Sequence, residues 1–252
     1  MPTLELDHLR DRLGRLDGKC AAAAYVSGSV VFPASILLIQ RLVLAPVRVC
    51  AHQKIFGTFF GGVAVGLSAI VASETARATY TIGSTIQRDG RISAASLAQA
   101  TTSSLCAPMQ SERWSLYAAG GVALFMGLGG RLRWAAPSSL VRPGAFAGKS
   151  LPATQNYADT NTRERLQLIG RASGCHTCGV RRAAFVGDHM PPLSLARPGQ
   201  AFRFYPQCAA CSSLQGGSLA TGRVPARPHR SLRLYHAWAP AGLAMAAWLR
   251  LE

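Results

Sequence analysis

The sequence predicts a mainly α-helical membrane protein in which about three transmembrane helices precede a small α+β module built around four cysteines. Composition is the first reason: 49% of the 252 residues are hydrophobic, only 15% are charged, and the mean hydropathy is +0.17. These values are too apolar for a disordered chain and too sparsely charged for an ordinary soluble domain. Three long uncharged stretches in the first half and two CxxC pairs in the second half complete the prediction.

The transmembrane region is assigned to residues 20–133. Its first two spans, 21–39 and 55–73, each lack charged residues and are just long enough to cross roughly 30 Å of hydrocarbon, although Pro33 should kink the first. The third, 114–130, starts at a tryptophan and stops before an arginine, which are typical interfacial anchors. Because no span contains Asp, Glu, Lys, Arg or His, transport by this chain alone is not expected.

Small residues recur four apart in the second and third spans, which lets another helix approach closely enough for backbone packing. We therefore predict a helix–helix seam, either between these two spans or against another protein. The alternative is a chance result of a composition rich in Gly and Ala. The positions are Gly57, Gly61, Gly62 and Gly66 in the second span and Ala119, Ala123 and Gly127 in the third.

Residues 1–19 are predicted to form an amphipathic helix on a membrane surface or a neighbouring subunit, because their leucines recur at helical spacing. The segment carries four acidic residues, which a mitochondrial presequence lacks, and it has no uncharged core typical of a secretory signal. We therefore expect no cleavable leader. Import into an organelle would then depend on the internal hydrophobic segments.

The basic residues are concentrated in the C-terminal half. The formal net charge is +16, and residues 1–19, 20–130 and 131–252 contribute 0, +4 and +12. Such an excess suits phospholipid, nucleic acid or an acidic partner subunit. In segment 219–252, which also holds a predicted apolar C-terminal helix, a basic cluster is expected to be solvated or to bind anionic phospholipid such as cardiolipin. The cluster consists of Arg223, Arg227, Arg230 and Arg233.

After a predicted linker over 134–170, residues 171–218 are predicted to form a zinc module. Four soft sulfur ligands in tetrahedral geometry favour structural Zn²⁺ and leave no open position for a substrate water. An iron centre or a dithiol redox pair is the alternative, and His176 or His189 could replace a cysteine ligand. Paired thiols of this kind indicate a reducing compartment. The expected ligands are Cys175, Cys178, Cys208 and Cys211.

The stretch from Cys175 to Gly216 also resembles a known family. The order CxxCG, AFVG, Asp188-His189 and CxxC is similar to the ββα-metal, treble-clef zinc module of HNH endonucleases. This resemblance implies that His189, with its neighbour Asp188, would be the general base. The chain departs from the family at Arg203, where an Asn is expected, and at Ser212, where a His or Asn is expected. In the alternative interpretation, Asp188 and His189 bond loop backbone in a rigid turn.

These observations together predict a non-catalytic accessory subunit of a large complex of the inner mitochondrial membrane, such as a respiratory-chain complex or ATP synthase. Its glycine-rich helices and zinc-stabilised module would brace neighbouring subunits, with the module on the reducing, matrix side. The alternatives are a membrane-tethered HNH-like nuclease that uses His189 and a zinc protein that binds nucleic acid without cutting it. For an accessory subunit, nucleic acid is not an expected partner.

Overall fold

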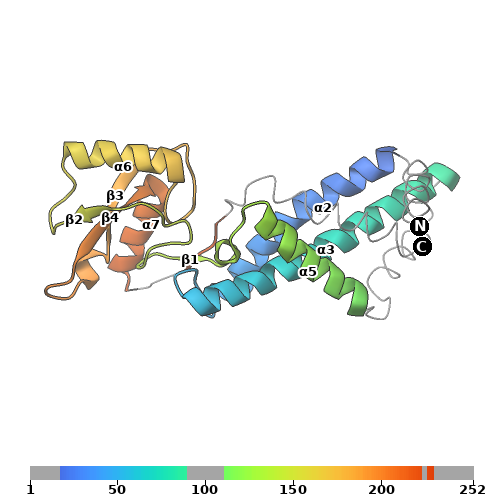
Figure 1. Cartoon of the computed structure of the whole chain (residues 1–252), viewed down its shortest axis with the longest axis horizontal. Coiled ribbons are helices and arrows are strands. Elements are labelled where there is room, and N and C mark those ends of the chain that lie inside the picture. The colour runs from blue at the N-terminus through green and yellow to red at the C-terminus, as the bar shows by residue number, and fades with distance from the viewer. Residues whose placement is uncertain (1–17, 90–110, 223–225, 230–252) are drawn as a thin grey trace, which may run out of the picture. The chain divides into compact units, whose positions relative to one another are not determined.

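The computed structural model describes residues 18–89, 111–222 and 226–229 (Figure 1). The chain divides into two compact units, each described by itself. The described residues of the helical unit are 18–36, 65–89 and 111–130, and those of the cysteine unit are 37–64, 131–222 and 226–229. The amphipathic helix predicted over 1–19 falls almost wholly outside the described residues, and the apolar C-terminal helix lies outside them entirely.

Three helices occupy the predicted spans. They are α2 (Gly18–Ile39), which continues into a π-helical turn at Gln40–Leu44, α3 (Lys54–Asp89) and α5 (Ser111–Gly127). By length and composition, Gly18–Leu44 and Lys54–Gln87 are apolar enough to cross a membrane. The helix at the third predicted span has 17 residues, and a third crossing there stays a prediction.

Helix α3 is longer than the predicted second span, which ended at residue 73. Its continuation to Asp89 is rich in Ser and Thr, whose hydroxyl groups donate to carbonyl groups one turn back. Thr79 Oγ1, for example, donates to Thr75 O at 2.8 Å, and the i,i+3 ion pair between Arg77 and Glu74 spans 3.0 Å. Because these polar groups find partners within the helix, the polar residues extend it instead of ending it.

Small residues hold α3 against α5 within the helical unit. Gly66 lies against Ala118, and a methyl group at Gly121 would overlap the Cβ of Ala69. The buried face of α5 thus runs through Gly121, with Tyr117 and Phe125 one turn away on either side. Of the predicted seam residues, Gly66 packs on α5. The residues chosen in the third span lie on the exposed face, where packing against another protein stays a prediction: Ala119, Ala123 and Gly127.

Helix α2 packs on α3 through small and polar side chains. Ala24 and Ala76 are buried against each other with Tyr80 beside them. Ser27 Oγ donates to Thr79 Oγ1 at 3.0 Å. These contacts explain why a helix pair with few large buried side chains stays close.

The first three glycines of the second span lie in the cysteine unit and contact loops, not another span. A Cβ at Gly57 would run into the Cys50 carbonyl oxygen, and one at Gly61 would overlap the Leu132 carbonyl oxygen. Gly62 lies next to the Leu132 side chain. Gly57 and Gly61 therefore approach loop backbone, whereas the seam was predicted to form against a helix.

A three-stranded antiparallel sheet forms the centre of the cysteine unit. Its order is β2 (Leu151–Ala153), β4 (Phe202–Cys208) and β3 (Phe185–Met190). Helices α6 (Thr160–Ser173) and α7 (Ala209–Ala220) both pack against β3 and β4 (Figure 1). A two-stranded sheet pairs β1 (Ser138–Ser139) with β5 (Ala226–Arg227), and short 3-10 turns lie at Leu132–Ala135 and Leu193–Leu195.

The prediction of a linker over 134–170 was wrong, because this segment supplies β1, β2 and most of α6 to the cysteine unit. Asp159 caps α6 by accepting the Thr162 N–H at 2.7 Å. Leu166 of α6 is fully buried with Leu151 and Phe204. Few residues of this helix are apolar, and the segment was therefore predicted as a linker.

Candidate metal centre

The four cysteine sulfur atoms form one cluster, in which all Sγ atoms lie within 4.8 Å of one another. The Sγ atoms of Cys178 and Cys208 are 3.7 Å apart. A tetrahedral zinc site with Zn–S bonds of about 2.3 Å places its sulfur atoms about 3.8 Å apart. The cluster therefore fits a tetrahedral metal ion such as zinc.

Three elements position the sulfur atoms. Cys175 and Cys178 lie in the turn that follows α6, Cys208 is the last residue of β4, and Cys211 lies in the first turn of α7. Antiparallel pairing places Cys208 opposite Phe185 of β3, and this phenylalanine is buried with the cysteines. The turn after α6, the end of β4 and the start of α7 thus bring the four sulfur atoms together.

The turn around the first CxxC pair depends on two glycines with positive φ. Gly174 has φ 91° and Gly179 has φ 77°, a region that side chains disfavour. The turn is closed by hydrogen bonds from the Cys175 amide to Val180 O at 2.8 Å and from the Gly179 amide to Cys175 O at 2.7 Å. These glycines allow both sulfur atoms of the pair to face the cluster.

Hydrogen bonds favour the thiolate form at Cys175. The thiols of Cys178 and Cys211 lower the pKa of Cys175 well below its usual range, and the Cys208 amide donates to Cys175 Sγ at 3.3 Å. Hydrogen bonding to Cys175 in turn raises the pKa of Cys178 to about 12 and raises that of Cys211 further. Four adjacent thiols cannot all ionise unaided, whereas a bound divalent cation offsets their negative charge.

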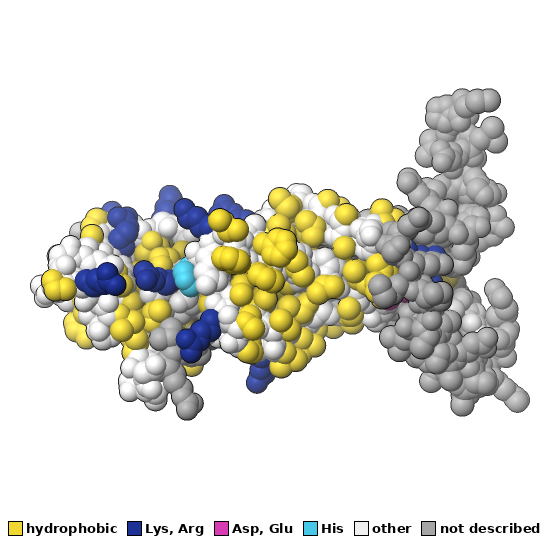
Figure 2. Space-filling view, turned by 90° about the horizontal axis from the view of Figure 1, so that it is seen from below, with side chains coloured by type: hydrophobic (Ala, Val, Ile, Leu, Met, Phe, Trp, Pro, Cys, Tyr) yellow, Lys and Arg dark blue, Asp and Glu magenta, His cyan; other side chains and the backbone are white. Residues whose placement is uncertain are grey.

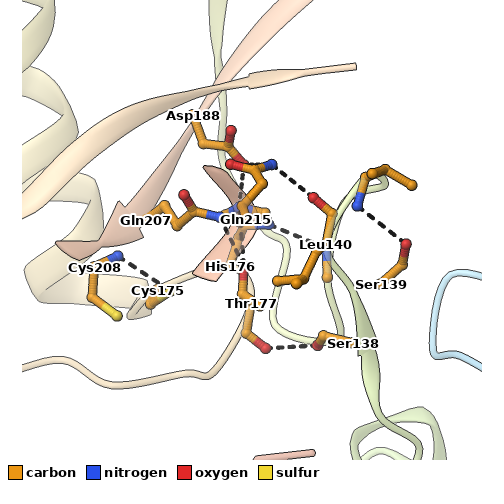
Figure 3. A network of polar contacts seen from close by, with 12 residues as sticks. Ser138, Ser139, Leu140, Cys175, His176, Thr177, Asp188, Gln207, Cys208 and Gln215 are labelled. Carbon is orange, nitrogen blue, oxygen red and sulfur yellow. Dashed lines mark hydrogen bonds and ion pairs between the residues drawn. The ribbon is translucent and has the colours of Figure 1, made fainter. Parts of the chain in front are cut away.

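A buried polar network extends from the first CxxC turn (Figure 3). His176 Nδ1 accepts the Gly144 amide N–H at 3.1 Å, so this nitrogen carries no proton. His176 is therefore neutral, and its Nε2–H donates to the Asp188 carboxylate at 2.9 Å. The ring is fully buried and bonds protein groups through both nitrogens, which excludes it as a replacement metal ligand in this geometry.

Gln215 of α7 joins this network to the loop before β2. Its Nε2 donates to Leu140 O at 2.7 Å and to Asp188 Oδ2 at 3.3 Å. Ser138 Oγ donates to Thr177 O at 2.6 Å in the same region (Figure 3). The network thus ties the metal-proximal turn to residues far earlier in the chain.

The structure separates the two residues of the expected catalytic pair. Asp188 bonds His176, whereas His189 Nε2 lies 3.1 Å from both Thr154 O and Asn156 O. Since carbonyl oxygens only accept, the Nε2 of His189 carries a proton and acts as a donor. Adjacent residues of a strand point to opposite faces, which explains why Asp188 does not assist His189.

His189 packs among aromatic rings and is only 7% exposed. The Phe204 ring centroid lies 4.5 Å away and the Phe202 centroid 6.0 Å away. His189 bonds loop backbone, as the alternative interpretation predicted, but it does so from within strand β3 and not from a turn. For Asp188 that interpretation needs correction, because its partners are the side chains of His176 and Gln215.

Arg203 stands where the family has an Asn. Its Nε donates to Ser150 Oγ at 2.7 Å and its Nη2 donates to Ser150 O at 3.2 Å. It therefore joins β4 to the residue before β2. Of the predicted lipid-binding arginines only Arg227 is described, and its Nη1 donates to Ala210 O at 3.1 Å. Arg223, Arg230 and Arg233 lie outside the described residues.

Comparison with protein-family models, with curated proteins and with solved structures returns no match for this chain. One cysteine pair precedes β3, and the second pair is formed by the last residue of β4 and a residue in the first turn of α7. The treble-clef assignment stays a prediction, whereas the clustering of four potential metal ligands is a property of the structure.

Sequence reasoning missed the roles of Gln215 and Ser138. Gln215 follows Cys211 by one helical turn, and both side chains are buried on the same face of α7. Had α7 been predicted, this spacing would have identified Gln215. No local pattern identifies Ser138, because its partner Thr177 is distant in sequence.

Proposed function

We propose that this chain is a non-catalytic, membrane-embedded accessory subunit of a large complex of the inner mitochondrial membrane. The observation that carries the proposal is the exposure of large apolar side chains along the long helices. Ile55 is 81% exposed, and Val30 and Phe59 are each 63% exposed. Burying such side chains in lipid or against a partner avoids the unfavourable contact with water, about 25 cal/mol per Å².

The exposed apolar side chains recur on α2, α3 and α5, and hydrophobic surface covers much of the face shown in Figure 2. Patches of this kind in a folded chain mark membrane or protein contacts. On α5, the exposed small residues Ala119, Ala123 and Gly127 suit close approach by a helix of a neighbouring subunit. The proposed partners are therefore other membrane subunits and lipid, with anionic phospholipid at the C-terminal arginines.

The proposed role of the module is structural and its proposed ion is Zn²⁺. Four thiolates complete a tetrahedral shell, so no ligand position remains for a substrate water. His189, the base implied by the HNH resemblance, uses its Nε2 proton to bond two carbonyl oxygens. Both features support bracing over nuclease chemistry in a treble-clef-like module.

Metal analysis of the purified full chain tests the zinc proposal. We expect about one zinc per chain, lost in Cys175→Ser because three thiolates hold the ion more weakly. Cys50→Ser is the matched control, since Cys50 is buried in the same unit but outside the cluster. Iron in place of zinc, or equal metal content in both variants, would contradict the proposal.

The assembly proposal is tested on protein extracted from its own membranes in mild detergent, followed by a native gel and mass spectrometry. We expect migration at many times 26.7 kDa together with redox or ATP-synthase subunits. The chain migrating alone would contradict the accessory role. Migration with nucleic acid would instead favour the nuclease or nucleic-acid-binding alternative and make His189 the first residue to mutate.

A further inference from the structure

A pocket of about 250 Å³ lies in the cysteine unit, and no cysteine of the four-cysteine cluster lines it. Its wall combines the connection between α2 and α3 with the loop around Arg142 and one residue of β5. Basic and polar side chains dominate this wall, and none of the described residues that line it is acidic. The lining residues are Arg48, Cys50, His52, Gln53, Ser139, Val141, Arg142 and Ala226.

The pocket is positively charged. Arg48 and Arg142 are exposed, and among the described residues neither arginine takes part in an ion pair. Partial burial and the nearby charge of Arg142 lower the pKa of His52, which favours its neutral form. The positive charge of the pocket therefore comes from Arg48 and Arg142. Two uncompensated cations at one opening attract an anion.

The polar groups of the wall suit an oxyanion. Guanidinium groups bind phosphate oxygens through paired N–H donors. Ser139 Oγ accepts the Val141 amide N–H at 3.3 Å, so its own O–H remains a further donor. A volume of about 250 Å³ lies below the usual range for drug-sized ligands, which favours a phosphate group or a small phosphate-containing headgroup over a larger ligand.

We propose that this pocket binds a phosphate group, with Arg48 and Arg142 as the principal ligands. The source favoured by position is a phospholipid headgroup, a point that rests on the proposed membrane function. Residues 45–53 connect the two helices that are long enough to cross a membrane, Gly18–Leu44 and Lys54–Gln87. In a membrane-spanning pair, that connection lies at the level of the headgroups.

The test uses the full chain purified in detergent at low salt and titrated separately with inorganic phosphate, short-chain phosphatidylglycerol and short-chain phosphatidylcholine. Binding is followed by calorimetry and by native mass spectrometry. The test variant is Arg48→Gln/Arg142→Gln. The matched control is Arg182→Gln, which removes an exposed arginine of the same unit that does not line the pocket.

We expect saturable binding that the double variant weakens about tenfold or more, because two charge-assisted contacts are lost, while Arg182→Gln leaves it unchanged. Tighter binding of phosphatidylglycerol than of inorganic phosphate would assign the lipid source, and equal binding would assign a soluble phosphate. The proposal would be overturned if neither inorganic phosphate nor phosphatidylglycerol bound saturably, or if both variants weakened binding equally. Phosphate binding by a chain that migrates alone on native gels would uphold the pocket while contradicting the accessory role.

Discussion

His229 shows at the scale of one residue how burial decides charge. By sequence it stands between Arg227 and Arg230 in the basic C-terminal segment, yet it is 3% exposed and its Nε2 donates to Ala136 O at 3.0 Å. Its amide donates to Gln40 Oε1 at 2.9 Å, and its ring meets Phe146 edge to face. This histidine is therefore a buried neutral group and not part of a cationic surface.

Burial lowers the pKa of His229 from 6.5 to about 4. The unfolded chain therefore takes up a proton below about pH 6.5 while the folded chain does not. We expect stability to be fully present above pH 6.5 and to fall by at most about 3 kcal/mol as the pH drops to 4. Chemical denaturation of the full chain in detergent at several pH values measures this loss.

The comparison variant for this prediction is His229→Gln, which keeps a side-chain N–H donor but does not titrate. Its free energy of unfolding should depend less on pH between 6.5 and 4 than that of the wild type. Acid release of metal from the cysteine cluster affects both proteins, so the difference between them isolates His229. Identical pH dependence would show that His229 contributes nothing to the acid sensitivity.

At the scale of elements, the contact between α3 and α5 depends on Gly121. A larger side chain there must displace Ala69, since even a methyl group would overlap it. We expect Gly121→Leu to destabilise the helical unit by about 1–3 kcal/mol, as overpacking does in other close contacts. Thermal unfolding of the detergent-solubilised chain measures the effect.

Gly127→Leu is the matched control, because Gly127 lies on the same helix and an added Cβ meets nothing within 4 Å. It should leave the isolated chain as stable as the wild type. In native membranes, where we propose that the exposed face of α5 packs on another subunit, Gly127→Leu should have the larger effect. It should weaken co-migration of the chain with its partner subunits. A larger loss of stability for Gly127→Leu than for Gly121→Leu in the isolated chain would contradict the observed seam.

Which elements could be predicted depended on the strength of their local pattern. Long uncharged stretches identified α2 and the first half of α3, and CxxC spacing identified the four cysteines that meet in space. Spacing alone could not choose between the two faces of α5, because Gly and Ala occur on both. Helix α6 was not predicted, because few of its residues are apolar and its packing depends on Phe204, which is far away in sequence.

At the scale of the whole molecule, the chain combines apolar helices with a cysteine unit larger than the predicted zinc module. Strand β2 and helix α6 enlarge its core, and the network around His176 and Asp188 ties the first CxxC turn to the loop before β2. The fit of the four sulfur atoms to a tetrahedral ion and the restraint on His189 both support a bracing role. All of these roles presuppose that the long helices lie in a bilayer.

Alkaline carbonate extraction of membranes that contain the full chain tests this central claim most directly. Carbonate strips proteins held by charge or by protein contacts and leaves those embedded through apolar helices. We predict that the chain stays in the membrane pellet in carbonate and in high salt, because the side chains exposed on α2 and α3 are apolar. Release of the chain into the soluble fraction would contradict membrane embedding and, with it, the proposed function.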